Sequence, residues 1–182
     1  MYRIKFIPFL IAILATVSYM ANAQSPYKHS IGVTLGTTQA LSYKTFLTNR
    51  FAVQLDLGTK YSVVCVGGYC NTPCWSMEVA PDFMYEGHFV KGLYGFVGGG
   101  LSLGLSFAPQ VCYFSSKVPG LVVRNIMGKA GANGIFGLEY KFDIPLSLQI
   151  DIRPGYRFQF NGETTVNHTI DLGLDFGVRY VF

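Results

Sequence analysis

The chain has 182 residues, of which 50% are hydrophobic and 13% are charged, and its formal net charge is +4. Arg3 and Lys5 lie in an apolar leader, and without that leader 12 basic residues remain against 10 acidic ones, a net charge of +2. So weak a charge, spread along the chain, excludes the clustered basic face that nucleic-acid binding requires.

The first residues have the pattern of an export signal. A basic start precedes an apolar run over 6–17, and Ala21-Asn22-Ala23 fits the small-x-small cleavage rule, which makes Gln24 the expected first mature residue. The alternative is a membrane anchor, but the run is shorter than the roughly 20 residues of a spanning helix. We therefore expect a cleaved signal over 1–23 and one domain over 24–182.

At the other end of the sequence an apolar side chain stands at every second position. The apolar set is Ile170, Leu172, Leu174, Phe176, Val178, Tyr180 and Phe182. A period of 2 indicates a β-strand, and the length of this run suits a tilted membrane-spanning strand better than an average soluble one.

Similar alternation predicts seven strands before this one, at 29–37, 40–47, 51–61, 75–85, 93–107, 129–142 and 146–158. Short links are expected at 47–50, 86–92 and 143–145, and longer ones at 62–74, 108–128 and 161–167, with the short link at 36–40 as an exception. Short turns at one end and longer loops at the other are typical of transmembrane barrels. The sequence thus predicts an all-β fold, an eight-stranded antiparallel up-and-down transmembrane β-barrel.

Two prolines interrupt the predicted strands. Because proline cannot donate to a β-ladder, Pro81 and Pro154 predict bulges.

The orientation of the two faces separates a membrane barrel from a soluble, lipocalin-like one. The apolar face carries too many large side chains for the interior of eight strands, which is only wide enough for side chains to fill it. The opposite face carries many glycines and all the strand charges. A charge facing lipid costs about 2–4 kcal/mol at the midplane, so we expect the apolar face to point outward.

The inward charges are the most distinctive set of polar residues. They are Lys44, Asp56, Lys60, Glu78, Asp82, Glu86, Glu139, Lys141, Asp151, Arg153, Arg157, Asp171, Asp175 and Arg179. Buried charges must be paired, so we expect a salt-bridge network in the lumen, with Arg153 and Arg157 reaching Asp171, Asp175 or Glu139. A gated ion path or an acid/base site is the alternative interpretation.

All four cysteines fall in the predicted longer loops, Cys65, Cys70 and Cys74 in one and Cys112 in the next. An even count in an exported chain favours disulfides. Three connectivities are possible, and we expect one bridge within the first loop and one between the two loops. The Cys70–Cys74 spacing would tolerate zinc, but no second pair and no nearby histidine completes a site.

The whole mature chain resembles the small bacterial outer-membrane β-barrels, among them OmpA-like transmembrane domains, OmpX-like proteins and opacity proteins. Its composition is most similar to the "outer membrane protein β-barrel domain" group of Bacteroidetes. The resemblance implies location in the outer membrane, contact with its lipid and lipopolysaccharide, and recognition by the barrel-assembly machinery. The residues that match the family's assembly signal are Phe176, Tyr180 and Phe182.

No catalytic triad, cofactor motif or complete metal site stands out in the sequence, so we expect a non-enzymatic protein without a cofactor. Loops on a rigid scaffold are where binding usually resides. Two cysteine-bearing loops with apolar residues predict contact with an extracellular protein or with lipopolysaccharide. A narrow lumenal channel and a soluble secreted binder are the alternative functions.

Overall fold

Eight strands form a closed barrel in the computed structural model, which describes residues 27–66, 69–110, 123–161 and 165–182. The strands are β1 (His29–Gly36), β2 (Thr38–Phe46), β3 (Phe51–Val66), β4 (Tyr69–Val90), β5 (Leu93–Gln110), β6 (Val123–Lys141), β7 (Leu146–Asn161) and β8 (Thr165–Val181). Each strand pairs antiparallel with the next, and β8 closes the sheet on β1 from Ser30↔Val181 to Gly36↔Asp175. The predicted up-and-down barrel is confirmed.

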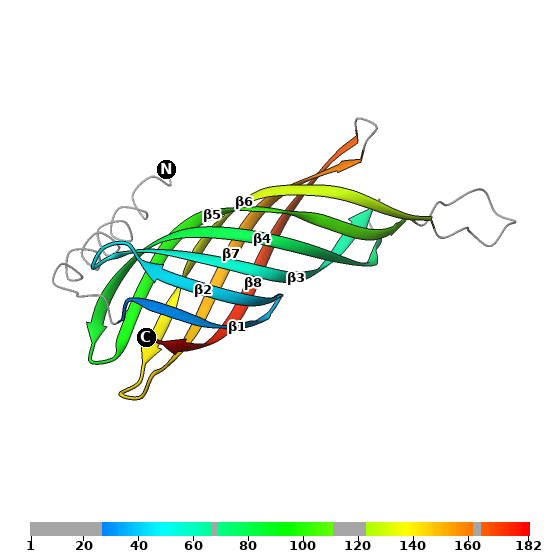
Figure 1. Cartoon of the computed structure of the whole chain (residues 1–182). Coiled ribbons are helices and arrows are strands. Elements are labelled where there is room, and N and C mark those ends of the chain that lie inside the picture. Colours follow the sequence, from blue (N-terminus) through cyan, green and yellow to red (C-terminus); the bar gives the residue numbers. More distant parts are fainter. Residues whose placement is uncertain (1–26, 67–68, 111–122, 162–164) are drawn as a thin grey trace, which may run out of the picture.

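The barrel has two unlike ends (Figure 1). At the turn end, β1 begins, β8 ends, and short connections over 47–50, 91–92 and 142–145 join the strands. The tightest turn includes Gly92, whose φ of 80° favours glycine because a side chain would be strained there. At the opposite, hairpin end, β3–β4, β5–β6 and β7–β8 extend well past the short β1–β2 hairpin.

The hairpins are longer than the side-chain pattern predicts. Residues 62–74 do not form a loop, because β3 continues to Val66 and β4 starts at Tyr69. Likewise β6 starts at Val123, before the expected 129, and β4 runs through 86–90, a segment predicted to be turn. The physical reason is that backbone pairing persists as long as a neighbouring strand supplies partners, even where the apolar alternation has stopped.

The two prolines do not produce the expected bulges. Pro81 pairs with Leu55 and Pro154 with Leu172, and the β4–β5 and β6–β7 registers are the same on both sides of the prolines. Only the pairs on the other side of each proline are missing. The ladder therefore omits the bonds that proline cannot donate without inserting a residue.

The structure turns the apolar face outward. Leucine, isoleucine, valine and aromatic side chains on all eight strands are exposed on the barrel wall, whereas the side chains that alternate with them are buried. This is the inverse of a soluble barrel and corresponds to a lipid-facing wall around a polar interior.

The described part of the chain contains no helix that is long and apolar enough to cross a membrane.

Candidate functional site: the charged lumen

The lumen is filled by polar and charged side chains from every strand. Alternation along the strands brings them together, since every second residue points inward. The buried charged residues are Lys44, Asp56, Lys60, Glu78, Asp82, Glu86, Lys129, Glu139, Asp151, Arg153, Arg157, Asp175 and Arg179. They form three clusters along the barrel.

The turn-end cluster is built around Lys44 of β2, whose side chain is 0% exposed. Its ammonium nitrogen lies 2.6 Å from Oε2 of Glu86 and 2.5 Å from Oε2 of Glu139. It also lies 5.2 Å from the ring centre of Phe46 and 5.4 Å from that of Phe96. Carboxylates and aromatic faces both stabilise a desolvated cation, so this lysine is held as a charged group.

Tyr27, which precedes β1, completes the turn-end cluster. Its hydroxyl donates to Oε1 of Glu139 at 2.7 Å, and its ring meets Phe46 edge-on at 5.2 Å. Burial raises the pKa of the Tyr27 phenol above its usual value, so the hydroxyl keeps its proton and donates.

An apolar layer closes the lumen beside these residues. Phe46, Ala52, Met84, Phe96 and Ile135 form one buried cluster with Tyr27 packed against it. A hydrophobic layer therefore occupies the polar lumen at the turn end.

The central cluster surrounds the guanidinium of Arg153 on β7. It lies 2.7 Å from Asp56, 3.1 Å from Asp82, 2.6 Å from Asp151 and 3.7 Å from Asp175. One cation thus holds together carboxylates from β3, β4, β7 and β8.

Side-chain amides donate hydrogen bonds to three of these carboxylates. Gln54 donates to Asp56, Asn133 to Asp82 and Gln149 to Asp151. Arg179 of β8 in turn donates through Nε to Oε1 of Gln149 at 3.0 Å. This network ties the strands together across the lumen.

The hairpin-end cluster contains Lys60, Lys129, Arg157, Glu78 and Asp171. Lys60 of β3 lies 2.5 Å from Oδ2 of Asp171 on β8, which also accepts from Arg157. Lys129 lies 2.5 Å from Oε1 of Glu78, and Arg157 lies 3.5 Å from Oε2 of the same carboxylate. Three cations therefore share two carboxylates.

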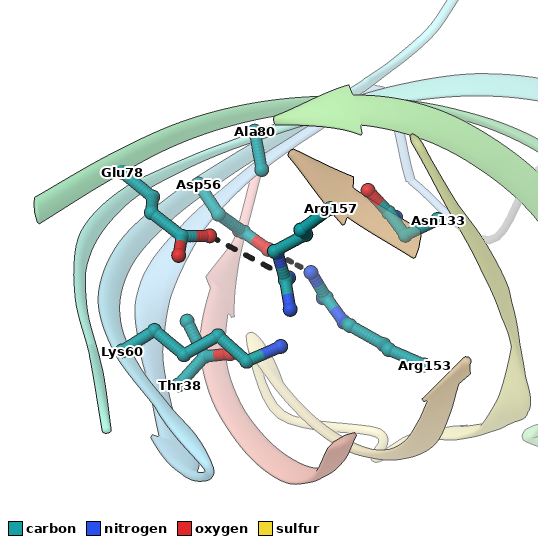
Figure 2. A pocket seen from close by; sticks show the side chains of 8 residues that line it. All are labelled: Thr38, Asp56, Lys60, Glu78, Ala80, Asn133, Arg153 and Arg157. Carbon is teal, nitrogen blue, oxygen red and sulfur yellow. Dashed lines mark ion pairs between the residues drawn. The ribbon is translucent and has the colours of Figure 1, made fainter. Parts of the chain in front are cut away.

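A small cavity lies between the central and hairpin-end clusters (Figure 2). Its lining includes Thr38, Lys60 and Glu78 on one side and Arg153 and Arg157 on the other. The space open to the centre of a water molecule is about 20 Å³, which is enough for about one water. The described side chains around this cavity are joined by ion pairs and hydrogen bonds.

The described residues contain no metal site, and the contacts of His29 and His88 are not those of a catalytic triad. No group of three or more histidine, cysteine, aspartate or glutamate side chains there is placed to hold a metal ion. His29 meets the hydroxyls of Tyr43 and Thr45, and His88 meets the ring of Tyr94. None of these contacts forms the Ser/His/carboxylate relay of a triad.

The structure distributes the predicted charge network over all three clusters. Glu139 belongs to the turn end, where it binds Lys44 and Tyr27 instead of the expected arginines. Asp151, Arg153 and Asp175 are central. Arg157 and Asp171 meet at the hairpin end, as expected.

Sequence reasoning missed three contributors to the lumen. Tyr27 lies outside any predicted strand, Lys129 was placed at a strand start, and the apolar cluster around Phe46 was not expected on the inward face. Lys129 and the apolar cluster had a sequence signal, since Lys129, Phe46, Met84, Phe96 and Ile135 occupy positions between the outward residues of their strands, whereas Tyr27 had none.

The cysteines lie on strands where they are described. Cys65 of β3 and Cys70 of β4 are register partners, and Cys74 of β4 pairs with Ser62. Cys112 lies outside the described residues. The aromatic residues Phe176, Tyr180 and Phe182 are exposed on the outer wall, and Phe182 is bonded through its backbone to His29.

A closed eight-stranded barrel with an apolar wall and a filled, charged lumen has the architecture of a small integral outer-membrane protein. Two solved outer-membrane proteins have the same fold. Neisserial surface protein A aligns with a TM-score of 0.54 at 14% identity, over 85% of this chain and 93% of its own. A major outer membrane protein from Thermus thermophilus aligns with a TM-score of 0.52 at 12% identity, over 86% of this chain and 100% of its own.

No family model matches the chain, and no curated protein matches it either. The two structural matches show that the chain shares the fold of these outer-membrane proteins.

Proposed function

We propose that the chain is a non-enzymatic outer-membrane protein that presents its long hairpins at the cell surface to bind a partner. The observation that carries this proposal is strand length. A tilted strand crosses a membrane in about 9–11 residues, whereas β4, β5 and β6 have 22, 18 and 19 residues. Their excess is on the hairpin end, so a rigid sheet would project beyond the bilayer.

The filled lumen supports a surface role over transport. A cavity for about one water, with Lys44 and the apolar cluster beneath it, supports a surface role better than the passage of solutes. The outward extension of the hairpins is then the feature of the molecule that is available for recognition.

The test removes one hairpin tip and asks whether binding is lost. Gln110 and Val123 are register partners, so an Asn-Gly turn can replace 111–122 and close the hairpin directly. A photo-crosslinking residue within 111–122, on intact cells, should give a covalent adduct with an extracellular protein. The shortened variant should insert normally, and any cell-surface phenotype of the protein should be lost with the tip.

A matched control uses the neighbouring hairpin. Asn161 and Thr165 are also register partners, so 162–164 can be replaced in the same way, and this variant should keep the adduct formed at 111–122. No adduct from any position in 111–122, or binding that survives loss of the tip, would contradict the proposal.

A further inference from the structure

The barrel wall has a gap above the β1–β2 hairpin. Pairing between β2 and β3 ends at Thr38↔Lys60, and pairing between β1 and β8 ends at Gly36↔Asp175. Beyond these pairs β3 continues to Val66 and β8 extends back to Thr165. There β3 is paired only with β4, and β8 only with β7. The two strands therefore flank a stretch where the wall lacks its two shortest strands.

Side chains close this gap from the lumen. Thr37 and the backbone N–H of Thr38 both donate to Oδ1 of Asp175, at 2.9 Å and 2.8 Å, which fixes the hairpin tip to β8. Just past the tip, Lys60 reaches from β3 to Asp171 on β8 at 2.5 Å. This ion pair links the two strands that border the gap.

The chemistry behind the gap favours an anion. The two carboxylates of the hairpin-end cluster, Glu78 and Asp171, stand against the three cations Lys60, Lys129 and Arg157. Nε of Arg157, the hydroxyls of Ser102 and Ser106, and Oδ1 of Asp171 are buried without a hydrogen-bond partner. The excess of one cation in this cluster and the unpaired N–H of Arg157 point to an incoming acceptor that would compete with Asp171.

The surroundings of the gap are apolar on the outside. Among the residues whose exposure the structure describes, Ile170 and Leu172 of β8 are the most exposed apolar ones, at 82% and 70%, and Leu57 on the β3 side is also exposed. Trp75 and Phe107 are register partners on β4 and β5. Trp75 is next in sequence to Ser76, the residue of β4 that pairs with Lys60. Exposed tryptophan and other aromatics mark the headgroup level of a membrane, so Lys60 lies at the depth of lipid phosphates.

We propose that the gap above the β1–β2 hairpin binds the phosphate-bearing headgroup of an outer-leaflet lipid, whose phosphate replaces Asp171 as the acceptor for Lys60 and Arg157. The acyl chains would lie against Ile170, Leu172 and Leu57. This inference rests on the membrane orientation in the proposed function and is independent of what the hairpin tips bind.

Trp75 provides the probe, because it is the only tryptophan in the chain and lies on the strand next to Lys60. The chain is refolded into phosphatidylcholine bilayers that contain brominated phosphatidic acid, or brominated phosphatidylcholine as the neutral reference, and quenching of Trp75 is measured. An anionic headgroup near one added basic residue gains about fivefold in association, so we expect about that preference for phosphatidic acid.

Two variants that break the same ion pair should shift this preference in opposite directions. Lys60→Met removes a cation and should abolish the preference, whereas Asp171→Asn removes the competing carboxylate and should increase it. Lys60→Arg should keep it. Lys91→Met makes the same charge change at the exposed turn end and should leave quenching unchanged.

Heat-dependent gel mobility verifies that each variant is folded. Equal shifts in the same direction for Lys60→Met and Asp171→Asn would mean that the pair is only structural and would overturn the proposal. Loss of the preference on adding inorganic phosphate at constant ionic strength would show a free-anion site instead, and would overturn the lipid assignment. Removal of 111–122 leaves Lys60 and Asp171 in place, so the two proposals fail separately.

Discussion

The ammonium nitrogen of Lys44 lies 2.5 Å from Oε2 of Glu139, although the two residues are 95 positions apart in the sequence. The pair joins β2 to β6 across the lumen, and Glu86 of β4 accepts from the same nitrogen. A single lysine thus cross-links three strands that are not neighbours in the sheet.

Loss of this lysine should destabilise the barrel strongly. Lys44→Met leaves Glu86 and Glu139 buried with their cation removed, and breaking a buried pair costs about 3–5 kcal/mol. The measurement is denaturant unfolding of the refolded barrel in lipid vesicles. Lys44→Met combined with Glu139→Gln should recover part of the loss, because one uncompensated charge is removed; a single variant as stable as the parent would contradict the assignment.

A charge on the outer wall should destabilise according to its depth. Leu55 is exposed about midway between Phe51 and Lys60 on β3, so Leu55→Arg should lower the free energy of unfolding in bilayers by about 2–4 kcal/mol. Leu47→Arg, in the turn-end connection, is the matched control and should cost about 0–1 kcal/mol. Equal effects at both positions would be inconsistent with a lipid-facing wall.

The intact barrel should not conduct like a porin. The aromatic rings around Lys44 narrow the lumen at the turn end, and the cavity beyond them holds about one water. Planar-bilayer recordings of the refolded chain should therefore show no large, steady conductance steps, and a variant with Phe46→Ala and Phe96→Ala should conduct more. Large steady channels in the parent protein would restore the channel hypothesis.

The cysteine pairing can be predicted more narrowly from register than from sequence. Directly opposed residues on antiparallel strands have Cα atoms about 4.5–5.5 Å apart, which lies within the range for a disulfide. Since Cys65 and Cys70 are opposed, we expect a Cys65–Cys70 bridge and a second bridge between Cys74 and Cys112. Peptide mapping without reduction checks this: Cys70→Ser should leave Cys65 as a free thiol, whereas a Cys65–Cys112 peptide would refute the pairing.

Much of the barrel follows from side-chain alternation. The eight strands, their order and the outward direction of residues such as Leu172 and Phe176 could be read from a period of 2, because that period assigns every residue to one of two faces. The exclusion of charges from one face then decides which side meets lipid.

Strand ends were predicted less well, for a physical reason. At 62–74 the alternation stops, but β3 and β4 continue because their backbones pair with each other. Pro81 similarly predicted a bulge, whereas the ladder omits the affected bonds without changing register. Both the strand ends at 62–74 and the register at Pro81 depend on pairing with a partner strand, which the local sequence does not specify.

By itself, the sequence determined the face that each strand residue occupies, and therefore that charges such as Arg153 and Glu139 are enclosed. Only the tertiary structure decided which of them meet, since the register and closure of the barrel bring Lys44 to Glu139 and Lys60 to Asp171. Alternation is a local property of the backbone, whereas a contact across the lumen depends on the offset accumulated over every strand between the two partners.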